Sequence, residues 1–155
     1  MPGFKELNLY PVSSTLRMPD YKVTDSIRYD AQTILNYTIK SVDSLLNMNC
    51  FIKSYENDPD AKLDIIATMM FQKQEVEFNR DTLKLLRETF ENIDTVKIGY
   101  LKYLIETPTE KFYESRIFFY RGRKIVVLWL FEKYQTHIQD ESSVIDCILQ
   151  SIKLN

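Results

Sequence analysis

The stretch KFYESRIFFYRGRKIVVLWLFEKY, residues 111–134, decides the fold. It holds two runs rich in β-branched and aromatic residues, which favour strands. Between them, Gly122 can supply the positive φ of a tight hairpin turn. The second run, Ile125–Phe131, has no polar residue on either face. It is therefore predicted to be a central strand with both sheet faces covered.

The segments around this hairpin extend it into a three-strand meander. Thr95–Thr107 predicts a first strand that ends before Pro108, and Lys111–Tyr120 and Lys124–Tyr134 predict the other two. After the meander, Ser142 or Ser143 can cap a C-terminal helix. The apolar stripe of that helix would be Val144, Ile145, Ile148, Leu149 and Ile152.

Upstream segments are assigned by the spacing of their apolar residues. Leu63–Phe71 is nearly all apolar and predicts a strand buried on both faces. Residues 79–93 predict a helix that starts at Asn79. Its stripe would be Leu83, Leu86, Phe90 and Ile93. The spacing in residues 25–48 favours a helix, although Ile34–Lys40 would also pass as a strand, and Cys50–Tyr55 predicts a short strand.

Together these elements predict an α+β protein, a three-layer α/β/α sandwich with a mainly antiparallel sheet. Residues 1–24 carry three prolines and predict an irregular lead-in with short extended pieces. Residues 25–155 predict a single domain, which the length of 155 residues suits.

Composition excludes several classes of function. Twenty basic and 22 acidic residues give a net charge of −2, which provides no field for nucleic acid or an anionic membrane. Only three glycines are present, too few for a phosphate-binding loop, so no cofactor is expected. With no signal-peptide pattern and no apolar run of about 20 residues, a cytoplasmic protein is expected. Cys50 and Cys147 are interpreted as small buried apolar residues, although one bridge between them stays open.

Candidate catalytic and metal-binding groups are few. The single histidine, His137, stands in a polar stretch without a nucleophile elbow and is interpreted as a solvated loop residue. The acidic cluster Glu56, Asp58, Asp60 and Asp64 lacks the glycine of a calcium loop and predicts an ordinary turn. The alternative enzyme hypothesis is a small hydrolase that uses the carboxylates Glu106, Glu110 and Glu114. Arg116, Arg121, Arg123 and Lys124 are interpreted as solubilising charges at a hairpin tip.

The stretch Leu63–Leu154 resembles the Mog1/PsbP/DcrB-like superfamily in its order of elements. The order is a strand, a helix over Arg80–Asn92, the meander, and a terminal helix that runs into Ser151-Ile152-Lys153. The resemblance implies an α/β/α sandwich that binds proteins rather than catalyses. Known members include Ran-binding factors, photosystem assembly subunits and chaperone-adaptors of type VI secretion effectors. No binding motif is recognisable, so no family residue is transferred.

We therefore expect a non-catalytic protein-binding module, such as a cytoplasmic adaptor or chaperone of the type that serves secretion effectors. A toxin-immunity protein is the alternative within the binding class. The meander holds more large aromatics than its core plainly needs, which favours an interface. Tyr103, Tyr113 and Tyr120 are the predicted contacts, because each neighbours charged residues. The partner would be another protein or a second copy in a homodimer.

Overall fold

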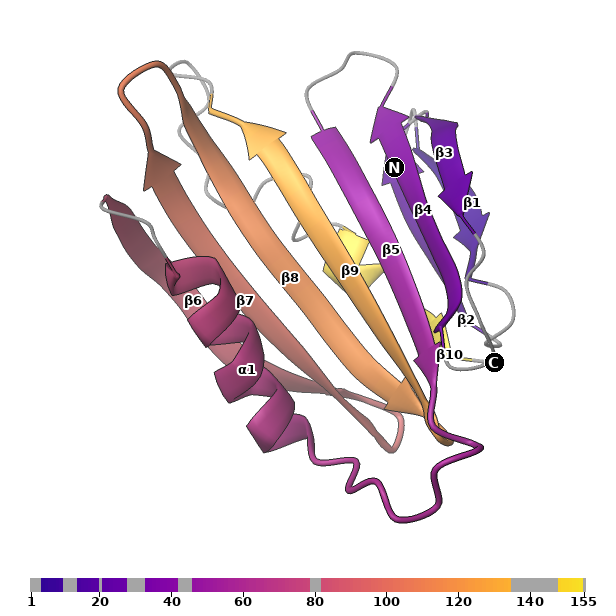
Figure 1. Ribbon diagram of the computed structural model, residues 1–155. Coiled ribbons are helices and arrows are strands. Elements are labelled where there is room, and N and C mark those ends of the chain that lie inside the picture. Colours follow the sequence, from indigo (N-terminus) through magenta and orange to yellow (C-terminus); the bar gives the residue numbers. More distant parts are fainter. Residues whose placement is uncertain are drawn as a thin grey trace.

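A computed structural model describes residues 4–9, 14–19, 21–27, 33–41, 46–78, 82–134 and 148–154. Its larger sheet consists of β3 (Tyr21–Ile27), β4 (Thr33–Ser41), β5 (Leu46–Ser54), β6 (Leu83–Ile93), β7 (Val96–Glu106), β8 (Lys111–Arg121) and β9 (Lys124–Lys133). These strands lie in the order β3-β4-β5-β9-β8-β7-β6 and every neighbouring pair is antiparallel (Figure 1).

The two faces of this sheet carry different elements. On one face lies α1 (Ile65–Glu77), which packs against β7 and β8 (Figure 1). On the other face lies a small sheet of β1 (Phe4–Asn8), β2 (Ser14–Pro19) and β10 (Lys153–Leu154). The helical segment 148–150 lies behind the large sheet as well. The antiparallel sheet is thus confirmed, whereas the described residues place only this short segment where a second helical layer was expected.

The predicted meander is confirmed as β7, β8 and β9. The strand β9 pairs with β5 on one side and β8 on the other, which makes it the middle strand of seven, as the apolar run Ile125–Phe131 predicted. Gly122 has a φ of 59°, so the glycine of the β8–β9 turn adopts the left-handed conformation for which it was singled out.

The prediction of a strand over residues 63–71 is wrong, since most of this segment belongs to α1. The helix begins after Asp64, whose carboxylate accepts a hydrogen bond from the Ile66 amide at 3.0 Å. Its residues Met69, Gln72 and Val76 face the sheet, while apolar residues also stand on the outer side. Apolar residues on both sides removed the helical period from the sequence and made the segment resemble a buried strand.

The predicted helix over residues 79–93 is also wrong, because Leu83–Ile93 forms the edge strand β6. The register of β6 against β7 shifts between Leu85 and Arg87, which marks a β-bulge. Leu83 packs against the buried cluster on the α1 face of the sheet and Ile93 against the cluster on the opposite face, so the apolar residues of this strand lie on both faces and their spacing of three and four resembles that of a helix. Asn79, the expected cap, lies outside the described residues.

The helix favoured for residues 25–48 is wrong as well. These residues supply the end of β3, the whole of β4 and the start of β5, so the strand alternative for Ile34–Lys40 is the correct one. Both pairings of β4 contain a register shift. The expected strand at Cys50–Tyr55 is confirmed up to Ser54. The lead-in 1–24 contains β1, β2 and the start of β3, so its short extended pieces are strands.

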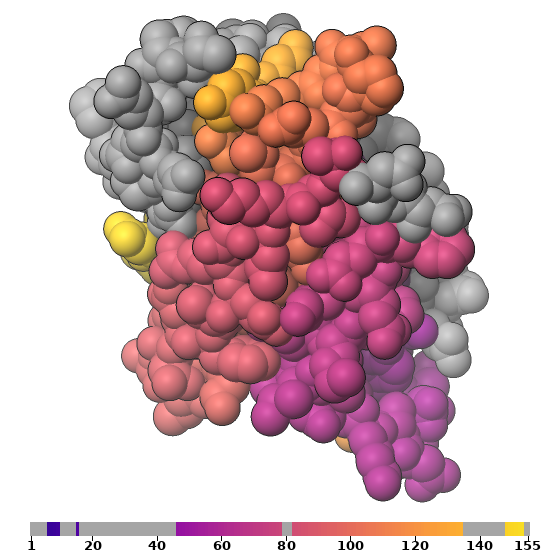
Figure 2. Space-filling view, turned by 90° about the vertical axis from the view of Figure 1, so that its left-hand side faces the viewer, coloured from indigo at the N-terminus to yellow at the C-terminus, as the bar shows by residue number. Residues whose placement is uncertain are grey.

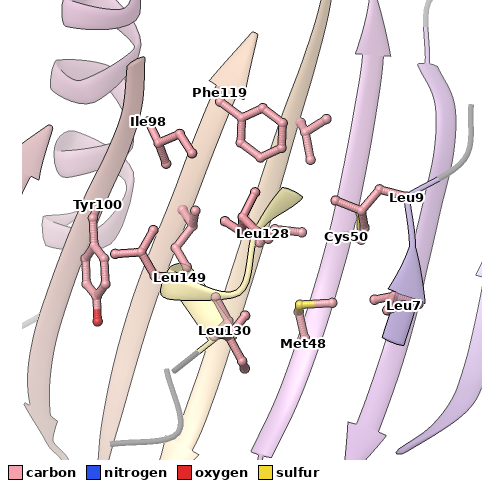
Figure 3. Packing of buried hydrophobic residues seen from close by; sticks show 14 of the residues in the cluster. Leu7, Leu9, Met48, Cys50, Ile98, Tyr100, Phe119, Leu128, Leu130 and Leu149 are labelled. Atoms are coloured by element: carbon pink, nitrogen blue, oxygen red, sulfur yellow. The ribbon is translucent and has the colours of Figure 1, made fainter. Parts of the chain in front are cut away.

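Two apolar clusters hold the layers together. The cluster opposite α1 joins Leu7 and Leu9 to alternate residues of β5, β7, β8 and β9 and to the segment around Ile148 (Figure 3). Cys50 is one of its buried members, as its interpretation requires, and Cys147 lies outside the described residues. The α1-facing cluster consists of Met69, Val76, Leu101, Tyr103, Ile105, Phe118, Ile125 and Val127.

Position 99 of β7 requires a glycine because the Phe118 ring packs over it. A Cβ atom built there would stand 2.3 Å from Cε2 of Phe118, its cross-strand neighbour on β8. Phe118 is fully buried in the α1-facing cluster. Because Gly99 has no side chain, the Phe118 ring has room to pack into this cluster.

In the part of the chain that is described, no helix is long and apolar enough to cross a bilayer.

Candidate binding groove beside the helix

The helix α1 covers only part of its sheet face, and a groove of about 670 Å³ lies beside it. The helix α1 forms one wall, and the neighbouring strands β5, β9 and β8 of the large sheet form the floor. The principal lining residues are Asn49, Phe51, Lys53, Tyr55, Lys62, Asp64, Ala67, Thr68, Phe71, Gln72, Glu75, Arg116, Tyr120, Ile125, Val127 and Trp129. Aromatic surfaces with a few polar groups are the usual composition of a binding pocket.

Arg116 forms the centre of one end of this groove. Its guanidinium carbon lies 3.9 Å from the centre of the Trp129 ring, and the two residues are cross-strand partners on β8 and β9. Its Nη1 donates to Oε1 of Gln72 at 2.6 Å and to Oε1 of Glu75 at 3.1 Å. The side chain is only 3% exposed, so this cation is buried and linked to α1.

Two donors at this end have no acceptor among the residues that the structure describes. Nε of Arg116 and Nε1 of Trp129 are both buried, and neither makes a hydrogen bond. A buried donor without a partner is uncommon and costly. The stacked Arg116–Trp129 pair therefore leaves capacity for a hydrogen-bond acceptor.

The opposite end of the groove is basic and aromatic. Nζ of Lys53 lies 5.0 Å from the centre of the Tyr55 ring, and exposed Lys62 precedes α1. The hydroxyl groups of Tyr120 and Thr68 are 2.7 Å apart, a hydrogen bond that ties β8 to the first turns of α1. Burial is the main cause that raises the pKa of Tyr120.

Arg123 fixes the loop that leads into this end. Its guanidinium donates to the backbone carbonyl oxygens of Tyr55, Asp58 and Ala61, at 3.1, 2.6 and 3.1 Å. Lys124, the next residue, pairs with Glu56. The β8–β9 turn thus holds the loop between β5 and α1 in place beside the groove.

Six large hydrophobic side chains are exposed in the described part of the chain, and all belong to α1, its C-cap residue or β6. We call this set the α1–β6 surface: Ile66, Met70, Phe71, Phe78, Leu85 and Phe90, each between 38% and 75% exposed. Both elements lie on the side of the molecule seen in Figure 2, and Lys73 of α1 pairs with Glu88 of β6 at 3.0 Å. Exposed apolar groups concentrated on two adjacent elements are typical of an interaction surface.

The three predicted contact tyrosines do not lie together. Tyr103 is fully buried under α1, where its hydroxyl donates to Oε1 of Glu77 at 3.0 Å. Tyr120 is half-buried and lines the groove. Tyr113 shares the opposite sheet face with Ile117 and Phe119, by strand alternation, and its ring packs 5.8 Å from that of Tyr134.

The other sequence candidates are dispersed. Glu106 and Glu110 are exposed at the β7–β8 turn, whereas Glu114 is buried within β8, and none of the three lines the groove. The acidic turn Glu56–Asp64 is exposed at its four carboxylates, and no group of metal-ligating side chains occurs among the described residues. His137 lies outside them.

The interpretation of Arg116 as a solubilising charge at the hairpin tip is wrong. Arg121, Arg123 and Lys124 do flank the β8–β9 turn, but Arg116 lies within β8 and is buried. Sequence reasoning missed both Arg116 and Trp129 as site residues. The available signal was alternation, since Arg116 stands at even spacing from Phe118 and Tyr120 and so shares their sheet face.

Comparison with known proteins identifies the fold. No protein-family model and no curated protein matches the chain. The solution structure of cyanobacterial PsbP (CyanoP) from Synechocystis sp. PCC 6803 matches with a TM-score of 0.65 and 9% identity, over 100% of this chain and 94% of that one. The Saccharomyces cerevisiae Ran-binding protein Mog1p matches with a TM-score of 0.55 and 11% identity, over 97% and 95%.

A structure of a Mog1 point mutant matches with a TM-score of 0.61 and 11% identity, over 97% of this chain and 95% of that one. The chain therefore has a Mog1/PsbP-like fold, and the resemblance stated from the sequence is confirmed at the level of fold. It is confirmed even though residues 63–71 and 79–93 have the opposite types of secondary structure from those expected.

Proposed function

We propose that this protein is a non-catalytic protein-binding module that acts in the cytoplasm as an adaptor or chaperone. The observation that carries the proposal is the α1–β6 surface, where six large apolar side chains are exposed on two adjacent elements. Burial of such side chains against a partner would supply the main driving force for association. The fold is consistent with this role, since one protein that shares it is described as Ran-binding.

The proposal also covers the number of domains and the role of each of the three predicted tyrosines. Leu7 and Leu9 share a buried cluster with β5, β7, β8 and β9, which supports one domain that includes the lead-in. Tyr120 remains a proposed contact through the groove, and Tyr113 would belong to a separate contact on the other sheet face. Tyr103 would act by positioning α1 rather than by direct contact.

Affinity capture from a lysate of the native organism tests the proposal. The double variant Ile66→Gln/Met70→Gln removes exposed apolar area and keeps good helix formers. We expect it to recover at least about tenfold less of the partner than the unchanged protein does. The control is Glu106→Gln/Glu110→Gln, two exposed positions at the β7–β8 turn, which should recover as much as the unchanged protein.

Light scattering on the purified protein separates the two kinds of partner. A dimer that the Ile66→Gln/Met70→Gln variant dissociates would identify a second copy as the occupant of the α1–β6 surface. A monomer that captures nothing, or equal capture by the two double variants, would contradict the proposal.

A further inference from the structure

We propose that the groove beside α1 binds an extended segment of a partner protein in which acidic side chains neighbour a large apolar one. The inference rests on the proposed function for its premise of a protein partner and adds the chemistry of the segment. The groove is separate in composition from the α1–β6 surface, since Phe71 is the one residue that the two share.

The middle of the groove suits an apolar side chain. Phe51 of β5, Val127 of β9 and Phe71 of α1 line it, between the basic end and the Arg116–Trp129 end. Its volume of about 670 Å³ falls within the usual range for pockets that enclose a ligand.

The charges of the lining favour an acidic segment. Glu75 is paired with Arg116, and Asp64 is engaged at the helix N-terminus by the Ile66 amide. Within the described ranges, Lys53 and Lys62 have no carboxylate partner, and Lys53 contacts the Tyr55 ring instead. Charge complementarity with two unpaired lysines selects carboxylates over amides and cations.

The other end of the groove holds two donors whose acceptors are missing from the described part of the chain. Nε of Arg116 and Nε1 of Trp129 are buried and donate to no partner in the described ranges, and the guanidinium lies over the indole ring. Both atoms are buried, so a backbone carbonyl oxygen of the bound segment would reach them only if the Trp129 side chain moves. The groove thus offers complementary groups for an apolar side chain and a carboxylate in succession, next to the Arg116–Trp129 end.

A random heptapeptide phage library, panned against the full chain, tests the inference without assuming a sequence. Enriched peptides should carry Asp or Glu within three positions of an aromatic or aliphatic residue. The most enriched peptide is then synthesised and titrated while the emission of Trp129 is recorded. Because the chain has a single tryptophan, a change in emission reports on the groove itself.

Two lysine variants give a matched comparison. Lys53→Met/Lys62→Met should weaken peptide binding by about tenfold or more. The control Lys84→Met/Lys97→Met removes the same charge from two exposed positions on β6 and β7, and should bind as the unchanged protein does. Thermal unfolding of both variants verifies that the fold is retained.

Three results would overturn the inference: no enrichment, peptides without acidic residues, or binding that leaves Trp129 emission and the Lys53→Met/Lys62→Met affinity unchanged. Displacement of the peptide by laurate at equal affinity would assign the groove to a small lipid and would also overturn it. None of these results would change whether capture of the native partner depends on Ile66 and Met70. The test of the groove can therefore fail while the proposed function still holds.

Discussion

The guanidinium of Arg116 is stacked on Trp129, 3.9 Å from the ring centre, across the paired strands β8 and β9. A cation over an indole ring gains about 0.5–2 kcal/mol, and the gain rises as the pair is shielded from water. Because the same guanidinium donates to Gln72 and Glu75, it also joins α1 to the sheet. This pair therefore fixes the distance between α1 and the floor of the groove.

Replacement of Arg116 by lysine tests that role. Lysine keeps the charge but lacks the planar fork that stacks and donates to two acceptors at once. Arg116→Lys should lower the free energy of unfolding by about 1–3 kcal/mol. The control Arg121→Lys, at the hairpin turn, should stay within about 0.5 kcal/mol of the unchanged protein. Urea unfolding measures both, and equal values for the two variants would contradict the account.

Two adjacent methionines test how α1 sits on the sheet. Met69 is 3% exposed and Met70 is 59% exposed. Met69→Ala should cost about 2–5 kcal/mol, since it leaves a cavity in the α1-facing cluster. Met70→Ala should change stability by less than about 0.5 kcal/mol. Thermal or urea unfolding measures the stability of both variants. A larger loss of stability in Met70→Ala than in Met69→Ala would contradict the orientation of α1 described above.

The contact between Gly99 and Phe118 predicts a cost and its rescue. Gly99→Ala places a methyl group where the Phe118 ring lies, 2.3 Å from Cε2, and should cost about 1–3 kcal/mol. In Gly99→Ala/Phe118→Leu the ring is gone, so the double variant should be more stable than the sum of the two single costs implies. If the two single losses in the free energy of unfolding simply add in the double variant, the Phe118 ring is not what excludes a side chain at position 99.

Tyr103 predicts a pH dependence of stability. Burial, and then the hydrogen bond to Glu77, raise the pKa of Tyr103 well above its ordinary value of 10.0. Since the unfolded chain releases this proton near pH 10 while the folded chain keeps it, the free energy of unfolding falls as the pH rises above 10. Tyr103→Phe removes this contribution, so the stability gap between the two proteins should narrow from pH 9 to pH 11. Urea titrations at both pH values measure the gap, and a constant one would refute the assignment.

The sequence predicts the strands at the centre of the sheet well and β4 and β6, farther from the centre, poorly. In β7, β8 and β9 the strand period is unbroken, and Gly122 marks a turn of known chemistry, so residue patterns and structure agree. The pairings of β4 and β6 contain register shifts, and in β6 apolar residues lie on both faces, so their spacing imitates a helix. No local pattern in a single sequence separates the two cases.

The site was predicted less well than the fold, for a related reason. Tyr120, one of the predicted contacts, lines the groove, but the apolar run that contains Ile66 and Met70 was assigned to the core. Hydrophobicity alone does not say which side of a segment faces water, because that depends on where the sheet lies. Arg116 was assigned to a turn because its charge suggested exposure, whereas its stacking on Trp129 depends on the pairing of β8 with β9.

Site-specific photo-crosslinking in the native organism tests the central claim most directly. A photo-reactive phenylalanine derivative is placed at the position of Met70, on the α1–β6 surface, and in a second protein at the position of Thr109, an exposed residue of the β7–β8 turn. The account predicts a discrete higher-mass adduct from position 70 and none from position 109. Adducts of equal yield at both positions, or at neither, would contradict a protein-binding role for this surface.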